Sequence, residues 1–238
     1  MIDKFEIRDI AIKALTYIEK IRNIVSVDEI DRNVENYIFE EIKKVTNNIK
    51  IVSEEYGNLT IGDPKQTIII DPIDGSGNLI RKIPIYAVSI ALCDGCLDEV
   101  TVENIEYSIV ASTFGIYESS SSDVPIQQNI GDISVSEALI RCVRPYRLRL
   151  LGASSVELCL LAMGSIDGFI EIRGLKSVDL IPPILILKKH GCYFCDKYGK
   201  ELKFGLSNPK EECFSIIAAR SKDLLNGILK QIKGDWNE

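Results

Sequence analysis

An apolar run that stops abruptly at two carboxylates is the most constraining feature of the chain. Residues 68–79 read Ile-Ile-Ile-Asp-Pro-Ile-Asp-Gly-Ser-Gly-Asn-Leu. The triple isoleucine is typical of a buried strand, and a strand over 66–70 holds its last residue rigidly. Asp71 and Asp74 follow on either side of Pro72, so a turn can aim both carboxylates into one pocket.

Two carboxylates this close favour a bound cation, and their oxygens suit Mg²⁺ or Mn²⁺. Gly75, Ser76 and Gly77 leave backbone N–H groups exposed, as an anion-binding turn or a helix start requires. The alternative is a capped turn, in which both carboxylates accept hydrogen bonds only from nearby backbone N–H groups. Spacing alone favours this alternative, and it does not fit the calcium-loop pattern, which needs acidic or amide residues at alternate positions.

The run Asp71-Pro72-Ile73-Asp74-Gly75-Ser76-Gly77-Asn78 resembles the Asp-Pro-Ile/Leu-Asp-Gly-Thr/Ser-x-Asn signature of the inositol monophosphatase superfamily, which includes fructose-1,6-bisphosphatases. The resemblance continues in order along nearly the whole chain. Its further segments are Asp31-Arg32-Asn33-Val34-Glu35, Ser53-Glu54-Glu55-Tyr56-Gly57, Gly152-Ala153-Ser154-Ser155, Asp167-Gly168-Phe169-Ile170-Glu171 and Ser177-Val178-Asp179. Val178, where the family usually has an aromatic residue, makes the chain look more like the archaeal inositol/fructose phosphatases than the animal or bacterial enzymes.

The resemblance implies roles for individual residues. The metal ligands that it implies are Glu54, Asp71, Asp74, Asp179 and the backbone carbonyl of Ile73. It further implies that Glu54, Ser76 and Asp71 are catalytic, with Glu54 and Ser76 orienting and deprotonating the attacking water. The substrate contacts that it implies are Gly75, Ser76, Ser154, Glu171, Arg173 and Asp179. Asp31 is expected near a further, weaker metal.

These roles imply a Mg²⁺-dependent phosphomonoesterase, with Mn²⁺ as a substitute metal. A phosphate monoester is anionic, and metals about 3.5–4 Å apart can neutralise its oxygens and activate water together. The expected substrate is a small sugar or polyol phosphate, inositol 1-phosphate or fructose 1,6-bisphosphate. The alternatives are a 3′-phosphoadenosine nucleotide phosphatase and a non-catalytic regulatory or binding protein that keeps the fold. A homodimer is what the resemblance suggests.

Basic residues bear on the substrate. Arg173 and Lys176 lie between Glu171 and Asp179, and further arginines precede Gly152, at positions 141, 144, 147 and 149. Arginine pairs with phosphate in a bidentate fork, so these residues can serve a second phosphate group. The alternative for any one of them is a solvated strand or a subunit contact.

Composition and charge exclude several classes of protein. With 238 residues, 46% hydrophobic and 26% charged, the chain can bury a large core and is neither disordered nor collagen-like. The formal net charge of -7 argues against broad nucleic-acid binding. Without an apolar leader or an apolar stretch approaching about 18 residues, a cytoplasmic protein without a membrane span is expected. The single histidine, His190, argues against histidine-based phosphoryl transfer.

Two cysteine pairs give a competing interpretation. Cys93-x-x-Cys96 and Cys192-x-x-Cys195 have the residue types of a four-thiolate zinc site. Both pairs lie at the ends of apolar strands, where residues three apart face opposite sides, and neither has a glycine knuckle. Buried unpaired cysteines are therefore the favoured interpretation. A zinc or redox protein and a disulfide bridge are the alternatives.

Hydrophobic periodicity predicts a layered α+β fold. Helices are expected over 3–23, 27–45, 154–163, 180–190 and 222–232, with Pro182 and Pro183 at the opening of the fourth. Strands are expected over 49–53, 66–71, 85–92, 108–111, 113–118, 124–127, 168–172, 192–195 and 215–219. An α+β half over 1–135, carrying most metal ligands, and an α/β half over 136–238 then form one compact unit. The resemblance implies that they stack as an αβαβα sandwich.

Overall fold

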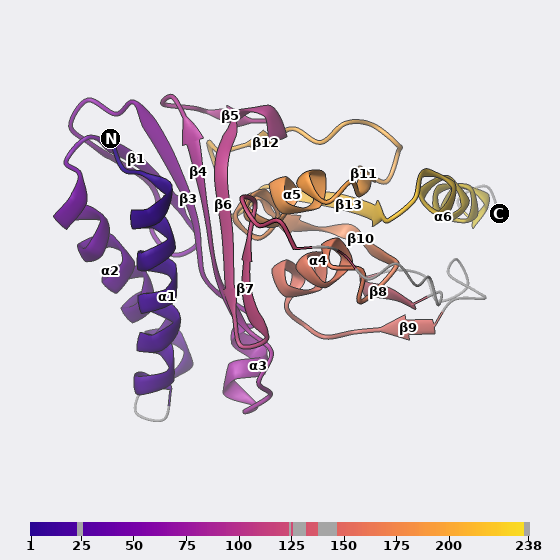
Figure 1. Ribbon diagram of the computed structural model, residues 1–238, viewed down its shortest axis with the longest axis horizontal. Helices are drawn as coiled ribbons and strands as arrows, with labels where there is room; N and C mark the ends of the chain where they lie inside the picture. Colours follow the sequence, from indigo (N-terminus) through magenta and orange to yellow (C-terminus); the bar gives the residue numbers. More distant parts are fainter. Residues whose placement is uncertain (23–25, 124, 126–131, 138–146, 236–238) are drawn as a thin grey trace.

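Helices and sheets alternate in layers through the molecule (Figure 1). The computed structural model describes residues 1–22, 26–123, 125, 132–137 and 147–235. Its helices are α1 (Lys4–Ile21), α2 (Val27–Val45), α3 (Ser76–Ile80), α4 (Ser154–Ala162), α5 (Ser177–Lys189) and α6 (Lys222–Asp235). Helices α1 and α2 cover the outer face of one sheet, α4 and α5 lie between the two sheets, and α6 covers the far face of the second (Figure 1). The predicted layered α+β fold is confirmed.

The described strands form two large sheets and a small ribbon. The first sheet has the order β2 (Gly57–Ile61), β1 (Ile49–Ser53), β3 (Gln66–Asp74), β4 (Ala87–Asp94), β6 (Ile105–Ser112), β7 (Gly115–Glu118). The second has the order β11 (Tyr193–Cys195), β13 (Cys213–Ala219), β10 (Gly168–Lys176), β8 (Asp132–Glu137), β9 (Arg147–Arg149). The ribbon pairs β12 (Phe204–Gly205) with β5 (Glu99–Val100), and a 3₁₀ turn, η1 (Val102–Asn104), follows β5.

Strand β3 is buried on both faces, which explains its triple isoleucine. Ile68 and Ile70 pack into the core beneath α1 and α2, whereas Ile69 packs into the core shared with α4 and α5. Successive side chains of a strand point to opposite faces, so a strand between two helical layers needs an uninterrupted apolar sequence. The apolar run therefore ends within a rigid strand, at the buried carboxylate Asp71.

The pairing of β1 with β3 brings two distant parts of the sequence together. The other pairs in this sheet are antiparallel, but β1 and β3 run parallel, and Ser53 lies opposite Ile70. Residues that follow two parallel strands leave the sheet at the same edge. Glu54 and Asp71 consequently emerge side by side.

Some elements differ from the sequence expectation. Strands β2 and β9 were not predicted, because β2 is an edge strand and all three side chains of β9 are exposed. Strand β8 was missed because Asp132 and Ser134 are polar yet buried. The predicted strand over 124–127 falls almost entirely on residues outside those described.

Helix α5 corrects the interpretation of the two prolines. The helix begins at Ser177, so Pro182 and Pro183 lie inside it and not at its opening. Proline has no N–H group, so the carbonyls of Val178 and Asp179 lack their usual donors four residues later. The helix starts earlier than expected, and at its start the Lys176 N–H donates to Asp179 Oδ2 at 3.0 Å, which satisfies one of the N–H groups that a helix start leaves unpaired.

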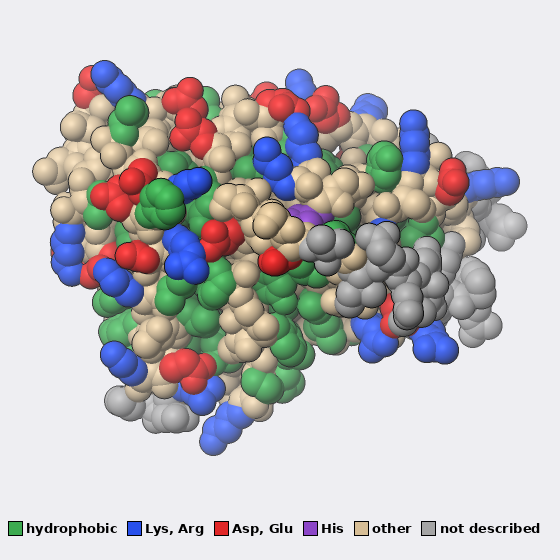
Figure 2. All heavy atoms as spheres, in the orientation of Figure 1, with side chains coloured by type: hydrophobic (Ala, Val, Ile, Leu, Met, Phe, Trp, Pro, Cys, Tyr) green, Lys and Arg blue, Asp and Glu red, His purple; other side chains and the backbone are tan. Residues whose placement is uncertain are grey.

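The charged surface and the described helices show no sign of a membrane-spanning helix. Acidic and basic side chains are intermixed over the described part of the face in Figure 2. Among the described residues, no helix is both long and apolar enough to cross a membrane. The division of the chain into halves at residue 135 remains a prediction.

Candidate metal centre

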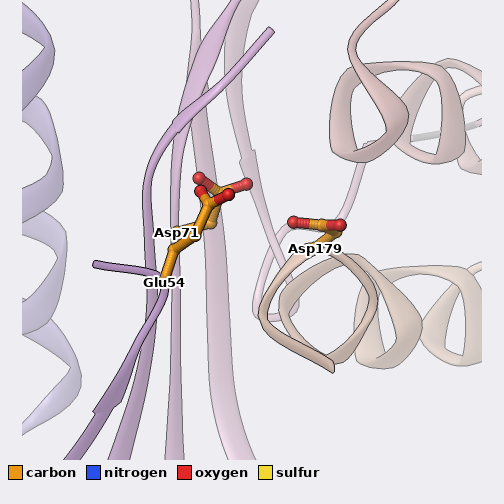
Figure 3. A group of neighbouring side chains, drawn as sticks. All are labelled: Glu54, Asp71 and Asp179. Carbon is orange, nitrogen blue, oxygen red and sulfur yellow. The ribbon is translucent and has the colours of Figure 1, made fainter. Parts of the chain in front are cut away.

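Three carboxylates from three separate elements converge between the layers. Glu54 follows β1, Asp71 lies in β3, and Asp179 lies in the first turn of α5. One carboxylate oxygen from each lies within 4.8 Å of the other two. Figure 3 shows Glu54 and Asp71 projecting from the sheet toward Asp179 on the facing helix. The geometry allows one cation to contact all three side chains.

Local hydrogen bonds fix two of these carboxylates. Asp71, which is 1% exposed, accepts the Ile73 N–H on Oδ1 at 3.1 Å. The pairing of β3 with β4 shifts register between Asp71 and Asp74, so the strand bends at Pro72. Asp179 accepts the Lys176 N–H, as described above. Both side chains keep a further oxygen for another partner.

Asp74 lies outside the group of three and faces a different partner. Its Oδ1 accepts the Ser154 N–H at 3.1 Å, and its Oδ2 accepts the N–H and the hydroxyl of Ser155 at 2.7 and 2.6 Å. These donors form the first turn of α4, where the helix dipole favours a negative charge. Asp74 thus ties β3 to α4, and its role as a metal ligand remains a prediction.

Burial and mutual repulsion both raise the pKa values of two of the clustered carboxylates, Asp71 and Asp179. Burial, followed by the charges of Glu54, Asp179, Asp74 and Asp31, raises the pKa of Asp71 well above its usual range. Burial, followed by the charges of Asp74 and Glu54, raises the pKa of Asp179 to about 8. A cation among these oxygens would offset this repulsion. The donor set therefore fits a hard divalent metal such as Mg²⁺.

Lys176 is the basic residue that the structure places against the cluster. Its Nζ donates to Glu54 Oε1 at 2.7 Å. Burial lowers the pKa of Lys176, but the hydrogen bond to Glu54 and the charges of Glu54, Asp179 and Asp71 outweigh burial and raise it. Lys176 was predicted near the site as a basic residue, but its bond to a candidate metal ligand was not.

The turn after Asp74 has the left-handed geometry that glycine permits. Gly75 has φ 87° and ψ 30°, and Ser76 is the first residue of the short helix α3. A Cβ atom on Gly75 would lie 2.7 Å from the Ile85 carbonyl oxygen and 3.0 Å from the Ala153 Cβ. The substrate contacts and the catalytic role expected of Gly75 and Ser76 remain predictions.

The substrate residues expected on β10, Glu171 and Arg173, differ in exposure. Glu171 is 4% exposed, and its Oε1 accepts the N–H groups of Arg173 and Gly174 at 2.7 and 3.1 Å. Arg173 is exposed and lines a cavity of about 430 Å³ with Lys197 and Tyr198, which none of the three clustered carboxylates lines. The roles of Glu171 and Arg173 toward a substrate remain predictions.

The other predicted basic residues and Asp31 lie in different places in the structure. Positions 141 and 144 lie outside the described residues. Arg147 is exposed in β9, and Arg149 pairs with Asp132, with Nη2 and Oδ2 2.7 Å apart. Asp31, on α2, lies near enough to raise the pKa of Asp71.

The cysteine pairs form no metal site in the described part of the chain. There, the carboxylates Glu54, Asp71 and Asp179 are the only group of three or more candidate ligands close together. None of the described cysteines forms a disulfide: Cys93, Cys159 and Cys195 are buried, Cys192 is partly buried, and Cys96 and Cys213 are exposed. Burial raises the pKa of the Cys93 thiol to about 12, as expected of a cysteine that packs as a small hydrophobic residue.

Glu157 is a buried residue that the sequence analysis missed. Its Oε1 accepts the N–H groups of Leu151 and Gly152 at 3.2 and 2.9 Å, which holds the loop leading into α4. Burial, and the nearby charge of Asp74, raise its pKa from 4.5 to about 7 against the lowering effect of these hydrogen bonds. The available signal was a single carboxylate within the apolar run over 156–162.

Replacing Glu157 with glutamine is expected to flatten the pH dependence of stability. Wild-type Glu157 takes no charge in the folded state until the pH approaches 7, so its stabilising contribution falls as the pH rises from 4.5 to about 7. The difference between the pKa of Glu157 in the unfolded chain, 4.5, and in the folded protein, about 7, corresponds to about 3 kcal/mol of unfolding free energy. Urea denaturation between pH 5 and pH 8 should therefore show a smaller loss for Glu157→Gln than for the wild type. The exposed Glu106→Gln is the control and should follow the wild type; equal slopes for all three would contradict the prediction.

An αβαβα sandwich with an acidic cluster between its layers defines the general class of this protein. Within that class, the chain belongs to the inositol monophosphatase family, whose sequence model matches residues 13–102 and 96–234. This is a family of metal-dependent phosphomonoesterases. The family resemblance expected from the sequence motifs is thus confirmed.

Individual relatives agree with this assignment. The chain is 31% identical over 200 residues to a fructose-1,6-bisphosphatase/inositol-1-monophosphatase of Methanocaldococcus jannaschii, covering 76% of each protein. It is 28% identical over 219 residues to the protein of the same name from Thermococcus kodakarensis, covering 87% of this chain and 82% of the relative. The crystal structure of an inositol monophosphatase-fructose 1,6 bisphosphatase superposes with a TM-score of 0.82 at 25% identity, covering 97% of this chain and 100% of the other.

Proposed function

We propose that the protein is a Mg²⁺-dependent phosphomonoesterase that hydrolyses a small sugar or polyol phosphate, inositol 1-phosphate or fructose 1,6-bisphosphate. The observation that carries the proposal is the convergence of Glu54, Asp71 and Asp179 within 4.8 Å. Burial and mutual repulsion raise the pKa of Asp71 and Asp179, as expected of carboxylates arranged to receive a cation. The names of the archaeal relatives support the substrate class.

Each site residue has a proposed role. Glu54, Asp71 and Asp179 hold the metal, and Asp74 and the Ile73 carbonyl complete its ligands from the same turn. Bound Mg²⁺ supplies charge that neutralises the phosphate ester and stabilises the leaving oxygen. Glu54 and Ser76 orient the attacking water and accept its proton.

The substrate is proposed to lie against the turn and the ends of two further elements. The N–H groups of Gly75 and Ser76 bind the phosphate, since backbone donors in such a turn attract anions. Ser154, Glu171 and Asp179 contact the substrate, with the Glu171 carboxylate accepting a hydrogen bond from a substrate hydroxyl. Arg173 is proposed to serve a second phosphate.

A phosphorylated nucleotide is the second candidate substrate. The chain is 25% identical over 241 residues to a bifunctional NADP phosphatase/NAD kinase of Methanococcus maripaludis, covering 82% of this chain and 42% of the relative. This relative favours a nucleotide that carries an additional phosphate monoester. A non-catalytic role is less well supported, because a protein that only binds a partner has no chemical reason to bury a repelling carboxylate cluster.

Phosphate release from a panel of substrates tests the proposal. Inositol 1-phosphate, fructose 1,6-bisphosphate, NADP⁺ and 3′-phosphoadenosine 5′-phosphate are compared with Mg²⁺ at raised temperature. Preferential hydrolysis of either of the first two supports the sugar or polyol class, and preference for a nucleotide replaces it with the second candidate. Release from none of them overturns the enzymatic proposal. A homodimer and a cytoplasmic location remain predictions.

A further inference from the structure

Lys176 contacts two of the three clustered carboxylates at once. It is the last residue of β10 and directly precedes α5. Its Nζ donates to Glu54 Oε1 at 2.7 Å, and its backbone N–H donates to Asp179 Oδ2 at 3.0 Å. Lys176 and Glu54 are 122 positions apart in the sequence, so the fold alone brings them together. The backbone contact with Asp179 fixes the start of the Lys176 side chain, and the contact with Glu54 fixes its ammonium group.

The ion pair between Lys176 and Glu54 offsets part of the negative charge of the carboxylate cluster. In the described part of the chain, no other lysine or arginine forms an ion pair with Glu54, Asp71 or Asp179. The pair is only partly screened, because the Lys176 and Glu54 side chains are 33% and 26% exposed. Lys176 therefore supplies one positive charge to a group of carboxylates that repel each other.

An ammonium group and a metal ion cannot share one carboxylate oxygen without strong repulsion. Lys176 Nζ already occupies Glu54 Oε1, so a divalent cation that binds Glu54 either takes that oxygen from Lys176 or binds Oε2 beside the ammonium group. In both cases electrostatic repulsion between the two cations opposes metal binding. The Lys176 N–H donates to Asp179 Oδ2, so the ammonium group stays close to the cluster and repels a bound cation wherever its side chain lies. Lys176 thus acts against metal binding through its charge and through its contact with Glu54.

We propose that Lys176 is a built-in competitor of the metal, which holds Glu54 in the metal-free protein and lowers the affinity of the site. The inference rests on the proposed metal site. It deepens that proposal, because it assigns the metal affinity to a residue that is not a ligand. A metal-free protein that keeps Glu54 paired also avoids part of the repulsion within the cluster.

Mn²⁺ binding to the substrate-free protein tests this inference. Free Mn²⁺ is measured by electron paramagnetic resonance in the wild type, Lys176→Met, Lys176→Arg and Lys188→Met. Lys188→Met is the control, because it removes the same charge from the ion pair that Lys188 forms with Glu103 at the other end of α5. The expected result is that Lys176→Met binds Mn²⁺ about five- to tenfold more tightly than wild type, and that Lys188→Met and Lys176→Arg stay near the wild type.

The melting temperature of the metal-free protein gives a second readout. Lys176→Met should melt at a lower temperature than the wild type without metal, and added Mn²⁺ should raise its melting temperature more than that of the wild type. Unchanged or weaker Mn²⁺ binding by Lys176→Met would overturn the inference while leaving the metal site intact. No Mn²⁺ binding by the wild type would overturn the metal site itself, and the inference with it.

Discussion

Asp71→Asn is expected to lower turnover about 10³-fold or more while the protein stays folded. Asp71 is 1% exposed and belongs to the group of three converging carboxylates. Asparagine keeps an oxygen for the Ile73 N–H but loses the negative charge that a hard divalent cation requires. The initial rate of Mg²⁺-dependent phosphate release, with circular dichroism on the same preparation, measures both effects.

The same variant is expected to melt at a higher temperature than the wild type when both are metal-free at pH 8. Burial and the neighbouring carboxylates raise the pKa of Asp71, so keeping it ionised in the folded protein costs free energy. That cost grows as the pH rises above the usual aspartate pKa of about 3.9. Asparagine removes it, and lower activity together with higher metal-free stability is a combination that general unfolding does not produce.

Asp196→Asn is the matched control for this substitution. Asp196 also accepts backbone N–H groups, from Tyr198 at 2.9 Å and Lys200 at 2.7 Å, but in a turn after β11 that is not part of the cluster. Asparagine can accept the same hydrogen bonds, so turnover should stay at the wild-type level. Near-normal turnover in Asp71→Asn would contradict the proposed role of Asp71 in binding the metal.

Gly75→Ala is expected to lower the free energy of unfolding by about 2–4 kcal/mol. At φ 87° any other L-residue is strained, and the added Cβ would lie 2.7 Å from the Ile85 carbonyl oxygen and 3.0 Å from Ala153 Cβ. The turn must shift to relieve these contacts, and Ser76 and Asp74 shift with it. We therefore expect turnover to fall together with stability.

Gly191→Ala separates backbone strain from crowding. Gly191 has φ 73°, close to that of Gly75, but a Cβ there would meet nothing within 4 Å. Its substitution should cost only the strain, about 1–2 kcal/mol, and leave turnover unchanged. Urea denaturation of both variants measures the difference, and equal costs would show that the space around Gly75 is not the limiting factor.

The sequence predicts best where local periodicity and burial coincide. The bounds of α2 were predicted as observed, because Ile30, Val34, Ile38 and Ile42 repeat at four-residue steps and all four are buried. The edge strand β2 gave no such signal, since three of its residues are exposed. Secondary structure that depends on pairing alone leaves little trace in the hydrophobic pattern.

The candidate site was predictable in its residue types but not in its internal contacts. Family motifs identified Glu54, Asp71 and Asp179, which the structure brings together. The contacts of Asp74 with α4 and of Lys176 with Glu54 join residues 80 to 122 positions apart, and no local pattern encodes such pairs. These contacts follow from how the sheets and helices pack, so they require the fold.

The dependence of phosphate release on Mg²⁺ tests the central claim most directly. Protein treated with a chelator is supplied with inositol 1-phosphate or fructose 1,6-bisphosphate, and the initial rate is followed as Mg²⁺ is added. The account predicts a negligible rate without the metal, a saturable rise as Mg²⁺ occupies the carboxylate cluster, and loss of activity when the chelator is restored. An undiminished rate in the absence of Mg²⁺, or no release from either substrate at saturating Mg²⁺, would contradict it.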